Sequence, residues 1–183
     1  MTTFSFPAGI HMWSDILLQR PRLSLLVLGS SCLAVVAAVA ALGTWFQLEV
    51  CAMCWFQRLV LLLAGTGFLL AAAWPRAQRV TLRLGEFGLL LGLASAARQT
   101  YLLFHIDSAS GSCGAGLLYY LQIGNYEAFF RAGLLGGLDC ATHQPLILGL
   151  YLPQWSLLAF CGLLAAYAAG MLVCARNGRS RQP

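Results

Sequence analysis

The chain has 183 residues, of which 60% are apolar and 9% are charged, and its mean hydropathy is +0.76. These values exclude an ordinary soluble globular domain, in which charged residues make up about a quarter of the sequence. The net charge of +5 comes from arginines alone, and it requires no nucleic acid partner, because arginines beside apolar segments also set membrane orientation and attract anionic headgroups. We therefore expect an integral membrane protein in contact with a lipid bilayer.

Four segments are apolar enough and long enough to cross a membrane, which takes roughly 20 residues. They cover about residues 23–46, 55–74, 84–104 and 155–174. Small residues recur within these spans, for example Gly88 and Gly92, and such residues let helix backbones approach closely in lipid. The sequence predicts an all-α protein with a single four-helix transmembrane domain over residues 23–174.

The arginines predict the orientation of this bundle, because short loops rich in arginine stay in the cytoplasm. Eight of them lie before the first span, between the second and third, or after the fourth: Arg20, Arg22, Arg76, Arg79, Arg83, Arg176, Arg179 and Arg181. Arg131 is the only one in the opposite loops. We therefore expect residues 1–22 and 175–183 to be cytoplasmic and the loops 47–54 and 105–154 to face the other side.

The first outer loop carries Cys51 and Cys54 immediately before the second span, in the sequence QLEVCAMCWFQR. A disulfide that closes so short a loop constrains almost nothing, so the pair is better suited to thiol exchange than to structural support. Cys54 also lies at the start of a helix, where backbone N–H groups and the helix dipole favour a thiolate. The spacing predicts a redox-active pair.

Three ionisable residues in or at the ends of the spans are candidates for the same site. Arg58 lies one helical turn below Cys54, where it is costly unless it binds something polar or extends to the headgroups. Arg98 lies deeper in the third span, and His105 follows two turns along the same face. We expect both to face the bundle interior and His105 to share a site with Cys54 and Arg58; the alternative for His105 is an interfacial position.

The second outer loop contains an apolar, aromatic stretch over residues 117–135. A fifth span here would place the arginine-rich C-terminus on the wrong side of the membrane. We instead expect a short helix lying in the interface, with Glu127 and Arg131 paired at i, i+4 on its wet side. A loop with a few buried aromatic residues is the alternative.

The seven cysteines separate by location. Cys113 and Cys140 join Cys51 and Cys54 in the outer loops, where four cysteines allow three connectivities. From the residues alone, a loop-stabilising bridge between Cys113 and Cys140 stays open, whereas zinc is disfavoured because a second CxxC is missing. The others fall within spans and receive no role: Cys32, Cys161 and Cys174.

A dithiol embedded at a membrane surface needs an electron acceptor, because re-forming a disulfide from two thiols releases two electrons. A quinone beside Cys54 is the simplest lipid-soluble acceptor. The residues therefore favour an enzyme that passes electrons from thiols to a quinone. The alternative is a non-catalytic four-span scaffold with structural loop disulfides; an enzyme like vitamin K epoxide reductase is disfavoured because its CxxC lies late in the bundle.

Three segments resemble the bacterial inner-membrane disulfide bond formation protein B (DsbB) family over about residues 25–174. They are CAMCWFQR (51–58), SAARQTYLLFH (95–105) and LDCATHQPLILGLYLPQW (138–155). The resemblance implies that Cys113 and Cys140 form the disulfide that oxidises a periplasmic, thioredoxin-like DsbA-type partner. Electrons would then pass to Cys51 and Cys54, and from there to ubiquinone or menaquinone.

The same resemblance assigns the quinone contacts. It implies that Cys54 is the thiolate in contact with the quinone, that Arg58 supports this thiolate, and that His105 lies near the quinone ring. Arg98 belongs to the matching segment of the third span, so we include it among the candidate quinone-binding residues. No metal site is expected.

Overall fold

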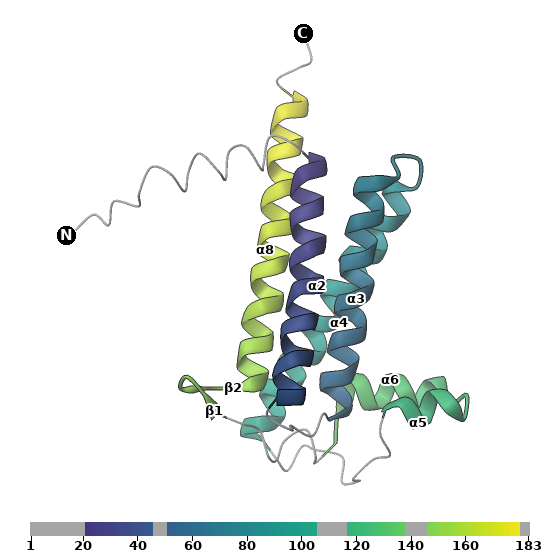
Figure 1. Cartoon of the computed structure of the whole chain (residues 1–183), viewed down its shortest axis with the longest axis vertical. Helices are drawn as coiled ribbons and strands as arrows, with labels where there is room; N and C mark the ends of the chain where they lie inside the picture. The colour runs from purple at the N-terminus through teal and green to yellow at the C-terminus, as the bar shows by residue number, and fades with distance from the viewer. Residues whose placement is uncertain (1–20, 46–50, 106–116, 138–145, 180–183) are drawn as a thin grey trace, which may run out of the picture.

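The computed structural model describes residues 21–45, 51–105, 117–137 and 146–179. Four long helices run side by side along the long axis of the molecule (Figure 1). They are α2 (Pro21–Trp45), α3 (Ala52–Ala73), α4 (Gln78–Phe104) and α8 (Leu152–Arg179). Each is long and apolar enough to cross a membrane. The predicted all-α bundle of four spans is confirmed.

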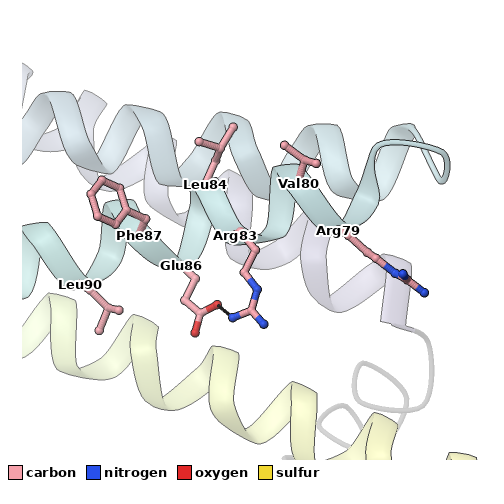
Figure 2. A pocket seen from close by; sticks show the side chains of 7 residues that line it. All are labelled: Arg79, Val80, Arg83, Leu84, Glu86, Phe87 and Leu90. Carbon is pink, nitrogen blue, oxygen red and sulfur yellow. Dashed lines mark hydrogen bonds and ion pairs between the residues drawn. The ribbon is translucent and has the colours of Figure 1, made fainter.

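Helix α4 begins at Gln78, earlier than the predicted span start at residue 84, because the apolar run marks the membrane and not the beginning of the helix. Arg83 forms an ion pair with Glu86 at 3.0 Å in this first part of the helix. Figure 2 shows this pair on the side of α4 that faces α8, whereas the Arg79 side chain extends away from the pair. The shallow pocket drawn there includes Phe87 and Leu90 and lies toward the opposite end of α4 from the cysteine pair.

Helix α3 is central, because it packs against both α2 and α4, while α8 packs mainly against α4. Gly88 lets α4 approach the backbone of α3, since a Cβ there would lie 2.8 Å from the carbonyl oxygen of Val60. Gly92 instead makes room for the Phe160 ring of α8. The two glycines of the predicted close-packing pattern therefore serve different neighbours.

Two short helices, α5 (Leu117–Gln122) and α6 (Tyr126–Leu135), lie across the bundle axis at the end where α3 begins (Figure 1). The predicted single helix is interrupted at Gly124, whose φ is +70°. Asn125 then caps α6, because its side-chain oxygen accepts a hydrogen bond from the Ala128 N–H at 3.0 Å. The short helix predicted in this loop is thus present, but as two pieces.

The ion pair predicted on this helix, between Glu127 and Arg131, is not formed; within the described ranges the only salt bridge is Arg83–Glu86. Glu127 and Arg131 are both exposed, and holding two exposed side chains in one geometry gains little free energy. Aromatic packing fixes α6 instead. The Phe129 ring of α6 contacts Phe56 of α3 edge to face, with ring centroids 6.0 Å apart.

A small hairpin that the sequence did not predict precedes the fourth span. Its strands are β1 (Leu146–Ile147) and β2 (Leu150–Tyr151), and positive φ angles at Leu148 and Gly149 form the tight turn between them. The Trp155 indole N–H donates to the carbonyl oxygen of Ile147 at 2.9 Å. This bond attaches the hairpin to the first turn of α8.

Candidate redox site

The two cysteines of the CxxC sequence lie where α3 begins. Cys51 is the N-cap residue of this helix and Cys54 lies in its first turn. Their sulfurs are 3.2 Å apart, whereas a disulfide bond measures about 2.05 Å, so a movement of about 1 Å joins them. Both residues are partly buried. The predicted proximity of the pair is confirmed.

The surroundings of the pair come from two helices. Met53 of α3 and Leu102 of α4 are fully buried against each other, and Cys51 packs against both. The start of α3 and the end of α4 therefore meet at this end of the bundle, as the antiparallel arrangement of the two spans requires. Packing at this end partly shields the two cysteines from solvent.

Gln99 of α4 is fully buried and faces the sulfurs. Its Nε2 lies 3.3 Å from the Cys54 sulfur and 3.5 Å from the Cys51 sulfur. Its Oε1 accepts a hydrogen bond from Gln57 of α3 at 2.8 Å. The oxygen of Gln57 in turn accepts a bond from the hydroxyl of Ser156 on α8 at 2.9 Å. Three spans therefore contribute polar side chains to the cysteine site.

Sequence reasoning missed these three residues, although a signal was available for two of them. Gln57 and Gln99 are polar residues inside apolar spans, and such residues generally hydrogen-bond across helices in membranes. Ser156 carried no comparable signal, because serine is common among the small residues of packed membrane helices.

The guanidinium of Arg58 faces α2. Its Nη2 donates to the carbonyl oxygen of Val39 at 3.4 Å, and its Cζ lies 5.7 Å from the centre of the Trp55 ring. Its Nε is buried and has no hydrogen-bond partner within the part of the chain that the structure describes. Arg58 thus retains a donor for a polar group beside Cys54.

Arg98 and His105 meet around a common neighbour, Tyr101. The His105 ring stacks on the Tyr101 ring with centroids 4.3 Å apart, and the Arg98 Cζ lies 5.4 Å from the same ring. His105 and Tyr101 are exposed, so the expectation that His105 faces the bundle interior is wrong. It follows the last residue of α4, beyond the packed interior. The predicted roles of both residues toward a quinone stay predictions.

The remaining predicted cysteines divide between described and undescribed parts of the chain. Cys113 and Cys140 lie outside the described residues, so their pairing stays a prediction. Cys32 is fully buried within α2, and Cys161 is exposed on α8. Cys174 lies in the last turns of α8.

The fold and the site together define a class: a multispan membrane protein with a close cysteine pair at one end of a four-helix bundle. The sequence matches the family described as "Disulfide bond formation protein DsbB" over residues 21–170. The chain belongs to the DsbB family and is a thiol oxidase, a quinone-dependent enzyme that generates disulfides.

Individual relatives agree with this assignment. The disulfide bond formation protein B of Hahella chejuensis is 34% identical over 144 residues, which cover 75% of this chain and 87% of the relative. The disulfide bond formation protein B 1 of Pseudomonas syringae pv. syringae is 32% identical over 150 residues, covering 80% and 87%. The protein of Methylococcus capsulatus is 34% identical over 134 residues, covering 69% and 82%. No solved structure matches the chain at a significant level.

Proposed function

We propose that this protein reoxidises a DsbA-type dithiol partner at the periplasmic face of the bacterial inner membrane and delivers the electrons to ubiquinone or menaquinone. The observation that carries this proposal is the 3.2 Å separation of the Cys51 and Cys54 sulfurs at the end of a membrane span. A pair in this position reaches water on one side for thiol exchange and lipid on the other for a quinone.

The electrons follow a balanced route through two cysteine pairs. A thiolate of the partner attacks the disulfide of Cys113 and Cys140 and forms a mixed disulfide, and the partner's second thiol resolves it. The partner leaves oxidised, and Cys113 and Cys140 are left as two thiols. Exchange with the disulfide of Cys51 and Cys54 then moves the two electrons to this inner pair.

The inner pair closes its disulfide again by giving up two electrons and two protons. A quinone held at this site would accept both the electrons and the protons and would become a quinol. Cys54 and Arg58 fit this ligand, because the Arg58 Nε is a buried donor without a partner among the residues described, and a quinone carbonyl oxygen is an acceptor. The partly buried Arg98 and the exposed His105 are further candidates, because both lie against the Tyr101 ring.

The positions of the arginines support an orientation of the bundle across the membrane. Arg76 lies in the turn between α3 and α4, and Arg79 and Arg83 lie in the first turns of α4, at the opposite end of α3 from the cysteine pair. Because arginine-rich ends stay in the cytoplasm, Cys51 and Cys54 face the periplasm.

The test is quinone reduction by the purified protein in detergent or nanodiscs, with a reduced DsbA-type protein as donor and a soluble quinone analogue as acceptor. We expect steady turnover for the wild type and a loss of at least about 100-fold for Cys54→Ser, because a hydroxyl cannot form the disulfide. Cys161→Ser removes an exposed thiol on α8 and is the matched control. Full activity of Cys54→Ser refutes the proposal, and absence of turnover in the wild type favours a non-catalytic scaffold.

A further inference from the structure

A chain of buried hydrogen bonds crosses the bundle and ends on the cysteine pair. It starts at the Ser156 hydroxyl on α8, passes through Gln57 at 2.9 Å and reaches Gln99 at 2.8 Å. The Gln99 amide then lies 3.3 and 3.5 Å from the two sulfurs. Gln57 and Gln99 are 7% and 0% exposed, so water does not replace these contacts.

The hydrogen bonds of this series run in one direction, with the NH₂ end of the Gln99 amide facing the sulfurs. The hydroxyl of Ser156 donates to the Gln57 oxygen, which leaves the Gln57 NH₂ as the donor to the Gln99 oxygen. The Gln99 NH₂ points to the sulfurs. Turning this amide alone would oppose its NH₂ to that of Gln57 and place an oxygen against the sulfurs. In the arrangement that the structure has, all donors point toward the cysteines, and hydrogen bonds aligned in this way strengthen one another.

An amide donor in this position distinguishes the two redox states of the pair. A thiolate accepts a hydrogen bond strongly, because bonds to ionised acceptors are roughly twice as strong as neutral ones. The sulfurs of a disulfide are weak, uncharged acceptors. The burial of Gln99 keeps water from competing for its N–H groups. This enlarges the difference in strength between its hydrogen bond to a thiolate and its contact with a disulfide.

We propose that Gln99 is a positioning residue that shifts the thiol–disulfide equilibrium of Cys51 and Cys54 toward the reduced form, with Gln57 and Ser156 holding its amide in place. This inference rests on the proposed function, in which the inner pair must accept electrons from an upstream dithiol. A pair biased toward its reduced form is the stronger oxidant of that dithiol. Gln99 thereby favours electron transfer from Cys113 and Cys140 to Cys51 and Cys54.

The test measures the equilibrium directly in the full-length protein, under anaerobic conditions and with neither partner nor added quinone. The protein is equilibrated with glutathione at a series of redox ratios. Glutathione disulfide is the oxidant here, and it is reduced to two glutathione molecules as Cys51 and Cys54 close their disulfide. Thiol alkylation and mass spectrometry of the peptide that contains both cysteines then give its oxidised fraction.

We expect Gln99→Leu to shift this equilibrium about tenfold toward the disulfide, which for a two-electron couple corresponds to a potential lower by about 30 mV. Gln99→Glu keeps the shape of the side chain but directs a carboxylate at the sulfurs, so we expect a shift at least as large. Gln57→Leu removes the orienting partner and gives a smaller shift in the same direction.

The matched control is Ser95→Ala. Ser95 is also fully buried on α4, but its hydroxyl donates to the carbonyl oxygen of Gly133 at 2.8 Å. Its loss weakens packing and leaves the redox equilibrium unchanged. An equilibrium within twofold of wild type in both Gln99→Leu and Gln99→Glu overturns the inference, and so does an equal shift in Ser95→Ala. If Gln99→Leu fails to fold, the glutathione equilibria of Gln99→Glu and Gln57→Leu test the inference in its place.

Failure of this inference and failure of the proposed function are distinguishable. The glutathione equilibrium requires neither quinone nor partner, so a shift in Gln99→Leu can be observed even in a protein that reduces no quinone. Conversely, a wild type that reduces quinone, together with an equilibrium insensitive to Gln99, refutes only the role of this residue.

Discussion

At the residue scale, each of two spans places a glutamine next to an arginine, and the two neighbours point in different directions. The side chains of Gln57 and Gln99 point into the bundle, where their amide groups are hydrogen-bonded to each other. Arg58 turns toward α2 and Arg98 toward Tyr101. A neutral amide can be fully buried once it is hydrogen-bonded, whereas a buried guanidinium is costly without a polar partner. Adjacent residues on one helix therefore serve different parts of the site.

Arg58 provides a prediction at this scale. We expect Arg58→Met to raise the apparent KM for a soluble quinone analogue roughly tenfold to hundredfold, since a hydrogen bond from a charged donor contributes about 1.5–3 kcal/mol. Arg58→Lys keeps the charge but not the planar set of donors, so we expect an intermediate value. Steady-state quinone reduction measures both variants. Arg76→Gln, at the exposed turn after α3, is the control, and an unchanged KM in Arg58→Met contradicts the assignment.

At the element scale, the spans meet through glycines that admit either backbone or rings. In lipid, no hydrophobic driving force brings helices together, so close packing and interhelical hydrogen bonds hold the bundle. Gly92 of α4 receives the ring of Phe160 from α8, and Phe160 is 3% exposed. This contact attaches the fourth span, which also supplies Ser156 to the cysteine site.

Substitution of Gly92 tests the contact between α4 and α8. A Cβ there would clash with Phe160 atoms Cε1 and Cζ, so we expect Gly92→Val to destabilise the bundle by about 1–3 kcal/mol, the usual cost of overpacking. Thermal unfolding in detergent, followed by circular dichroism, measures the change. We expect Phe160→Leu to restore part of the loss in the double variant.

Gly162 is the matched control for this substitution. A Cβ at Gly162 on α8 meets nothing within 4 Å, so Gly162→Ala should leave the unfolding temperature unchanged or slightly higher. Equal behaviour of the two glycine variants would contradict a specific role for the Gly92 contact.

At the scale of the whole molecule, the arginines around the turn between α3 and α4 and the cysteine pair lie at opposite ends of the bundle. Helix α2 begins and α8 ends at the same end as the turn between α3 and α4, whereas the cysteine pair, α5 and α6 lie at the other end (Figure 1). In the proposed orientation, Arg76, Arg79 and Arg83 lie on the cytoplasmic side, where arginines interact favourably with anionic headgroups. The same proposed orientation exposes the cysteines to an oxidising compartment.

Reporter fusions test this orientation. We expect alkaline phosphatase, which is active only outside the cytoplasm, to be active when fused after residue 137 and inactive when fused at the C-terminus. The physical reason is the arginine excess at the opposite end. Replacing Arg76, Arg79 and Arg83 together with alanine should raise the activity of the C-terminal fusion. The reverse pattern of activities in the unmodified chain would refute the assigned direction.

Local features of the sequence were sufficient for much of this protein. Hydropathy predicted the four spans because apolar length is a property of consecutive residues. The CxxC spacing predicted the contact between Cys51 and Cys54 for the same reason, since one helical turn separates them. The break at Gly124 and the hairpin before α8 were missed, because one or two positive φ angles leave little trace in a hydropathy pattern.

The sequence by itself therefore determined the spans, the family and the close cysteine pair, all of which depend on residues near one another in the chain. Only the tertiary structure decided what surrounds the sulfurs. Gln99 meets Cys54 across 45 positions, Gln57 across 42, and Ser156 meets Gln57 across 99. Such contacts depend on how the helices are rotated and packed in three dimensions. The same packing left His105 exposed at the end of α4 and placed Gln99 beside the thiols.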